Sequence, residues 1–110
     1  MKYNKLVRDK IPEIISRDGK IPVARELTSD EYQYYLLKKL KEETAEFEDY
    51  PCLEELADIL EVVLALANAH GYTSIALDME RYRKRRERGG FSKKILLERV
   101  YDKKRRMYVE

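Results

Sequence analysis

The amino-acid sequence predicts an all-α fold, a small helical bundle of three main helices and a short N-terminal helix, with a minor β ribbon. Charged residues make up 40% of the chain and hydrophobic residues 44%, with four Gly and three Pro. This composition is typical of globular, helix-rich proteins, because apolar residues suffice for a core and helix breakers are few. A length of 110 residues predicts a single domain over residues 1–110. A helical chain this short often depends on a partner subunit for stability.

The first expected elements are short. Residues 11–17 show a helical apolar pattern, Pro12 suits a first helical turn, and Gly19 stops the helix. Residues 20–27 carry alternating apolar side chains and predict a short strand. Residues 95–101 contain β-favouring side chains, and we expect them to pair with the first strand as a small ribbon.

Three longer helices are expected between these two strands. Thr28 followed three residues later by Glu31 is a capping-box pattern, and Thr73 offers a second capping hydroxyl. Pro51 and Gly71 are breakers that separate the helical segments. The three expected helices cover residues 28–49, 53–70 and 73–88.

The net charge of +2 conceals an uneven distribution. Residues 28–61 contain eleven Asp and Glu against three Lys and Arg, whereas residues 81–110 contain thirteen Lys and Arg against four Asp and Glu. A site for a metal–polyphosphate ligand needs both signs of charge, although two solvated faces of opposite charge give the same pattern. Charge alone leaves both interpretations open.

The first long helix places an acidic residue among apolar ones. At ~100° per residue, Glu43 falls within the apolar stripe, Glu46 lies at its edge, and Glu42 points away from it. A carboxylate in such a stripe is costly to desolvate unless a cation or hydrogen bonds compensate it. The stripe consists of Leu36, Leu40, Thr44 and Phe47.

The second long helix is apolar around most of its circumference, which is typical of a buried helix. Glu55 and Asp58 lie on one side of it, three residues apart. Two carboxylate pairs on neighbouring helices can present four oxygen ligands to Mg²⁺, with Mn²⁺ as a substitute. No cluster of His and Cys favours zinc. A solvated acidic face is the alternative interpretation of the same residues.

The acidic motif resembles that of a known enzyme family. The sequence EETAE at residues 42–46 and EELAD at residues 54–58 is similar to the EExxE…ExxD pattern of the all-α NTP pyrophosphohydrolase superfamily, which includes MazG-like proteins. Residues 3–12, YNKLVRDKIP, and residues 84–91, KRRERGGF, look like the small phosphoribosyl-ATP pyrophosphohydrolase-like branch. The resemblance extends to about Leu97.

The resemblance implies a hydrolase and its cofactor. The implied reaction is Mg²⁺-dependent hydrolysis of a nucleoside triphosphate, or a related nucleotide, to the monophosphate and pyrophosphate, as in nucleotide-pool housekeeping. The implied assembly is a homodimer or a higher homo-oligomer. Carried over to this sequence, the metal ligands are Glu43, Glu46, Glu55 and Asp58. Glu43 or Glu46 is the candidate general base, and Glu42 is a supporting residue.

Basic residues near both ends of the chain are candidates for binding substrate phosphates, because cations neutralise charge on the phosphate oxygens. Lys84 and Arg88 are four residues apart on one helix face, and Gly89 and Gly90 let backbone N–H groups approach a phosphate closely. A solvated cationic helix end is the alternative. The N-terminal candidates are Lys5, Arg8 and Lys10.

Two other functions compete with the enzyme. A nucleic-acid-binding helical module would use the basic C-terminal third, although the acidic central helices repel phosphate without a metal, so nucleic acid is not the expected partner. A purely structural helical assembly would leave the acidic residues solvated. Within the basic tail, residues 98–110, the cations at residues 103–106 are expected to be solvated or to make a weak contact with another subunit or with nucleic acid.

The expected compartment is the cytoplasm. Cys52 is the only cysteine, which fits a reducing environment. No apolar run of about 18 residues predicts a membrane span, and the first residues lack the apolar segment of a signal peptide. We therefore expect a soluble protein without a membrane partner.

Overall fold

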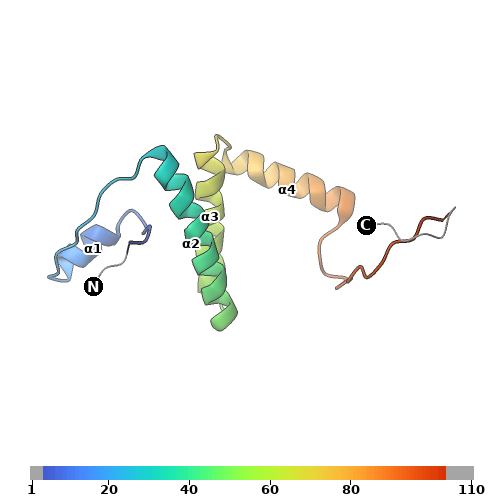
Figure 1. Cartoon of the computed structure of the whole chain (residues 1–110), viewed down its shortest axis with the longest axis horizontal. Coiled ribbons are helices and arrows are strands. Elements are labelled where there is room, and N and C mark those ends of the chain that lie inside the picture. Colours follow the sequence, from blue (N-terminus) through green and yellow to red (C-terminus); the bar gives the residue numbers. More distant parts are fainter. Residues whose placement is uncertain (1–3, 104–110) are drawn as a thin grey trace. The chain divides into compact units, whose positions relative to one another are not determined.

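The computed structural model describes residues 4–103, and the helices in this part of the chain confirm the all-α class. The chain divides into two compact units, Met1–Leu77 and Asp78–Glu110. The single domain over residues 1–110 stays a prediction. The helices are α1 (Ile11–Arg17), α2 (Ser29–Asp49), α3 (Leu53–Ala69) and α4 (Ser74–Arg88), which agree with the expected bounds to within one residue (Figure 1).

The start of α2 is fixed by the capping box that the sequence predicts. Thr28 Oγ1 accepts a hydrogen bond from the Glu31 N–H at 3.3 Å, and Glu31 Oε1 accepts one from the Thr28 N–H at 3.1 Å. Arg25 adds an ion pair, with Nη2 2.7 Å from Glu31 Oε2. The hydrogen bonds from the Arg25 side chain and the Thr28 backbone lower the pKa of Glu31 to about 2. This cap gives α2 a defined first turn.

The helices α2 and α3 lie side by side as a hairpin, with residues 50–52 as the turn (Figure 1). Leu36 of α2 and Val62 of α3 are the buried hydrophobic residues of the described chain, 2% and 8% exposed. The rest of α3 is less enclosed than its composition predicts, since Leu56 remains 47% exposed and Leu60 58% exposed. The hairpin therefore keeps a large apolar surface open to solvent.

The end of α3 is a Schellman motif, which explains why Gly71 stops the helix. The Tyr72 N–H donates to the Ala67 carbonyl at 2.9 Å, and the Gly71 N–H donates to the Asn68 carbonyl at 3.0 Å. This geometry requires a left-handed residue, and Gly71 has φ +86°. Thr73 then caps α4 through a 3.0 Å hydrogen bond that its Oγ1 accepts from the Ala76 N–H.

The expected β ribbon is absent from residues 4–103, which contain no strand. Residues 20–27 and 95–101 were the expected partners. In the first of these segments, Ile21 is 91% exposed and Val23 98% exposed, so no apolar surface covers it. A two-stranded ribbon without a packed face is only marginally stable in water. Tyr101 forms an isolated β bridge, but the structure does not otherwise support the ribbon, because β propensity needs packing to take effect.

The second unit contains most of α4 and the segment that follows it. Side-chain ion pairs line α4, and Arg83 contacts both Glu80 and Glu87. The basic tail predicted for residues 98–110 falls partly on residues 104–110, which lie outside the described residues.

Within residues 4–103, no single helix is long and apolar enough to cross a membrane. Only α3 and α4 counted together, across the break between them, reach the length and composition of a span.

Candidate functional site

Carboxylates from α2 and α3 converge between the two helices of the hairpin. One oxygen from each of Glu43, Glu55 and Asp58 lies within 4.8 Å of the other two. Oxygens of Glu42, Glu43 and Glu46 form a second group with the same spacing. Glu43 belongs to both groups. The i, i+3 spacing on each helix places both pairs on one face, one turn apart. We call these residues the acidic cluster: Glu42, Glu43, Glu46, Glu55 and Asp58.

Glu43 is the most enclosed member of the acidic cluster, with 5% of its surface exposed. Its Oε1 lies 3.2 Å from Nζ of Lys39, one turn earlier on α2. Its Oε2 is also buried and has no hydrogen-bond partner in the described part of the chain. Burial raises the pKa of Glu43, while Lys39 opposes this shift and the nearby Glu46 adds to it. An unsatisfied buried oxygen of this kind costs about 1–3 kcal/mol.

On α3, Glu55 and Asp58 are partly buried. Glu55 Oε2 is buried and, among residues 4–103, has no hydrogen-bond partner. Asp58 Oδ1 accepts a hydrogen bond from Arg8 Nη2 at 2.6 Å. Each helix of the hairpin therefore contributes one enclosed carboxylate oxygen whose charge is not compensated by a donor.

The acidic cluster fits a hard divalent cation. All its donors are carboxylate oxygens, which Mg²⁺ and Mn²⁺ prefer, and the described residues bring no His or Cys into it. A cation between the helices would satisfy the two orphaned oxygens of Glu43 and Glu55 and remove the like-charge repulsion. Glu46 is exposed, so this side of the cluster stays open to a ligand.

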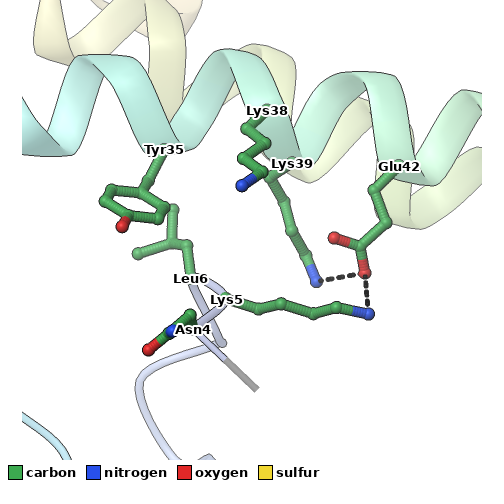
Figure 2. Close-up of a pocket in the computed structure, with 7 residues that line it drawn as sticks. All are labelled: Asn4, Lys5, Leu6, Tyr35, Lys38, Lys39 and Glu42. Atoms are coloured by element: carbon green, nitrogen blue, oxygen red, sulfur yellow. Dashed lines mark ion pairs between the residues drawn. The ribbon is translucent and has the colours of Figure 1, made fainter. Parts of the chain in front are cut away.

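Glu42 lies differently from the sequence-based expectation that it points away. Its Oε1 is 3.2 Å from Lys5 Nζ and 3.6 Å from Lys39 Nζ, as the dashed lines of Figure 2 show. A long Glu side chain can bend around the helix, and two ammonium groups attract it. Glu42 therefore faces the N-terminal segment and joins the edge of the acidic cluster.

Sequence reasoning missed Lys39. This residue pairs with both Glu42 and Glu43, and its side chain is 21% exposed. The signal was present in the sequence, because residues three and four apart on a helix are neighbours. Lys39 supplies the positive charge that keeps Glu43 partly compensated.

The predicted phosphate-binding residues divide between the two units. Lys5 and Arg8 reach carboxylates of the acidic cluster. Lys10 is exposed at the N-cap of α1 and forms no ion pair within residues 4–103. The remaining candidates, in the second unit, are Lys84, Arg88, Gly89 and Gly90. All four are exposed, and their contact with a phosphate stays a prediction.

Comparison with known proteins gives one match of limited extent. The chain is 56% identical over 41 residues to an uncharacterized protein of Mycolicibacterium smegmatis (strain ATCC 700084 / mc(2)155), and the matched segment is 37% of this chain. It covers 42% of that relative, so the chain spans less than half the length of the curated relative it matches. No family model matches the chain, and no solved structure matches it.

Proposed function

We propose that this chain is an all-α, MazG-like nucleoside triphosphate pyrophosphohydrolase. It hydrolyses a nucleoside triphosphate or a related nucleotide to the monophosphate and pyrophosphate, in the cytoplasm, as nucleotide-pool housekeeping. The observation that carries the proposal is the pair of buried, orphaned oxygens on Glu43 and Glu55, from facing helices, with Asp58 within 4.8 Å. This arrangement supports a site for Mg²⁺, for which Mn²⁺ substitutes.

The proposal divides the acidic cluster by role. Glu43, Glu46, Glu55 and Asp58 would hold the metal, which would supply neutralisation of phosphate charge and a water molecule of lowered pKa. Glu43 or Glu46 accepts the proton of that water. The raised pKa of Glu43 suits proton acceptance, and the exposure of Glu46 suits contact with a substrate. Glu42 is a supporting residue that orients Lys5.

Cations next to the acidic cluster are proposed to bind the substrate phosphates. Arg8 and Lys5 lie on carboxylates of the cluster and are therefore close to any phosphate that a bound metal holds. They contribute electrostatic stabilisation of the transition state. Candidates for further phosphate contacts are Lys10, Lys84, Arg88, Gly89 and Gly90.

The proposed assembly is a homodimer or a higher homo-oligomer. Leu53, Leu56 and Leu60 on α3 are 82%, 47% and 58% exposed. Because the described residues bury only two hydrophobic side chains, the hairpin lacks the core that a stable domain needs. A second copy that packs on α3 would bury this surface, as helices do in a four-helix bundle.

The test is release of pyrophosphate from a panel of canonical and modified nucleoside triphosphates, with Mg²⁺ and with EDTA. We expect metal-dependent release, with the nucleoside monophosphate as the other product. Glu46→Gln should abolish turnover while circular dichroism shows unchanged helicity. Release of inorganic phosphate instead of pyrophosphate would contradict the assigned bond.

The rival function, a nucleic-acid-binding module that uses the basic C-terminal third, has a separate test. Salt-sensitive binding of DNA or RNA in EDTA, without hydrolysis of any nucleotide, would favour it over the enzyme. We expect no such binding, because the acidic residues along α2 and α3 repel an extended polyanion such as DNA or RNA.

A further inference from the structure

A small pocket lies beside the acidic cluster, between the N-terminal segment and α2 (Figure 2). Its volume is about 140 Å³, about ten times the roughly 10–15 Å³ that a cavity needs, on the same measure, to hold one water molecule. The pocket is large enough for a phosphate group with its bound water. Seven residues line it, namely Asn4, Lys5, Leu6, Tyr35, Lys38, Lys39 and Glu42.

The pocket carries a surplus of positive charge. Its lining has three lysines and one carboxylate, that of Glu42. Lys5 and Lys39 share a single oxygen of this carboxylate, at 3.2 and 3.6 Å. Lys38 forms no ion pair with any residue from 4 to 103. Lys39 Nζ also lies 3.2 Å from Glu43 Oε1, so Lys5 and Lys39 already face the carboxylates of Glu42 and Glu43. An anion in the pocket would therefore find one ammonium group without a counter-charge, that of Lys38.

An aromatic side chain holds the uncompensated ammonium at the pocket. Lys38 Nζ lies 5.9 Å from the centre of the Tyr35 ring, within the range of a cation–π contact. The Tyr34 ring packs edge-on against Tyr35, with centroids 5.2 Å apart and planes at 86°. Figure 2 shows the Lys39 side chain extending from α2 toward Lys5, while the Lys38 side chain ends nearer to Tyr35. Tyr35 thus contacts the one pocket lysine that has no carboxylate partner within residues 4–103.

We propose that this pocket binds a phosphate group directly, without a metal ion. Lys5, Lys38 and Lys39 donate charge-assisted hydrogen bonds to its oxygens. Lys5 and Lys39 lie 3.2 and 3.6 Å from one carboxylate oxygen of Glu42, so both ammonium groups already face a single anionic oxygen.

The pocket is also a candidate binding site for one phosphate of the proposed nucleotide substrate. Glu42 belongs both to the pocket and to the acidic cluster, so the two sites share an edge. A nucleotide held by metal at Glu43 can place a neighbouring phosphate in the pocket. This link to the substrate rests on the proposed function, whereas phosphate binding by the pocket does not.

The experiment is calorimetric titration of the full chain with inorganic pyrophosphate in EDTA, at low salt. We expect wild-type protein to bind, and Lys38→Gln to bind about tenfold more weakly, the change expected when one charge-assisted hydrogen bond is lost. Lys41→Gln is the matched control, because Lys41 is exposed on the same helix and does not line the pocket. Its affinity should equal that of wild type. Circular dichroism checks that all three proteins are equally helical.

Two outcomes would contradict the proposed phosphate site. In one, wild-type protein does not bind pyrophosphate at all, and in the other, Lys38→Gln and Lys41→Gln lower the affinity for pyrophosphate equally. The latter result would mean that pyrophosphate senses only the net charge of the helix. Parallel titrations with inorganic phosphate and a nucleoside monophosphate, which carry similar charge, show whether the pocket prefers a free phosphate or the phosphate of a nucleotide.

The proposed phosphate site and the proposed enzymatic activity can fail independently, and the two failures can be told apart. Binding of pyrophosphate in EDTA without hydrolysis of any nucleotide supports the pocket and rejects the proposed function. Metal-dependent hydrolysis with unchanged pyrophosphate affinity in Lys38→Gln supports the enzyme and rejects the pocket.

Discussion

Arg8 Nη2 lies 2.6 Å from Asp58 Oδ1, although the two residues are 50 positions apart in the sequence. This hydrogen bond fastens the N-terminal segment to α3 at a residue of the acidic cluster. The guanidinium gives Asp58 the positive charge that a bound metal would otherwise supply. If Asp58 binds Mg²⁺, the cation and Arg8 compete for the same carboxylate, and release of Arg8 leaves it available to a phosphate.

Removal of this competitor is our first prediction. Arg8→Ala should bind Mg²⁺ about two- to fivefold more tightly, the change expected when an exposed ion pair no longer has to break. Turnover of the nucleotide should fall in the same variant, because a phosphate-binding cation is lost. Calorimetric titration with Mg²⁺ measures the first effect, and Arg17→Ala, an exposed cation on α1, is the control. Unchanged Mg²⁺ affinity in Arg8→Ala would show that Arg8 and Mg²⁺ do not compete for Asp58.

The second prediction concerns the orphaned oxygen of Glu43. Mg²⁺ should raise the melting temperature of wild-type protein, since a ligand at about 100 times its Kd stabilises the native state by about 2.7 kcal/mol. Glu43→Gln should lose most of this shift, because a neutral amide is a poor Mg²⁺ ligand. Glu48→Gln removes an exposed charge from the same helix and should keep the shift. If Mg²⁺ raises the melting temperature of both variants equally, Glu43 is not a metal ligand.

The third prediction follows from the lowered pKa of Glu31, which is about 2 instead of the ordinary 4.5. A carboxyl group whose pKa is lower in the folded than in the unfolded chain stabilises the fold at any pH above the unfolded pKa. This contribution is lost as the pH falls from 4.5 through 2. Because the hydrogen bond from Arg25 is the largest cause, Arg25→Gln should raise the pKa of Glu31. NMR titration of the Glu31 carboxyl carbon measures the change. Lys20→Gln, an exposed cation in the same segment, should leave it unaltered, and a Glu31 pKa unmoved by Arg25→Gln would refute the assigned cause.

The fourth prediction tests the exposed face of α3. Wild-type protein should sediment as a dimer or a larger oligomer, whereas Leu60→Lys should shift the mass toward the monomer, because a charge on this face opposes burial. Glu61→Lys introduces the same side chain at the adjacent exposed position and should retain the assembly. A wild-type protein that stays monomeric at all concentrations would contradict the proposed homo-oligomer.

Most of the helical structure could be predicted from local sequence signals. The capping box of Thr28 and Glu31 and the breaker Gly71 act through contacts within a few residues, so pattern and structure agree at these positions. The expectation of a β ribbon did not rest on such a local signal, and the described residues contain no strand. Pairing of residues 20–27 with 95–101 requires contacts across most of the chain, which β propensity does not encode.

The candidate site was partly predictable for the same reason. Helical periodicity places Glu43 on the buried stripe, and the structure has it 5% exposed. The acidic residues of α3 follow from the same spacing. Periodicity does not describe where long side chains end, so Glu42 was expected to point away and Lys39 was overlooked. The Arg8–Asp58 contact depends on how the N-terminal segment folds over the hairpin, which no local signal reveals.

The most direct test of the central claim is the rate of pyrophosphate release as a function of Mg²⁺ concentration, for wild type, Asp58→Asn and Glu54→Gln. Glu54 is exposed on α3 and lies outside the acidic cluster, so its variant controls for the loss of one acidic charge. We predict saturable, EDTA-sensitive release in wild type and Glu54→Gln, and none in Asp58→Asn at equal helicity. Equal release by all three proteins, or release that persists in EDTA, would contradict a metal-dependent hydrolase built on the acidic cluster.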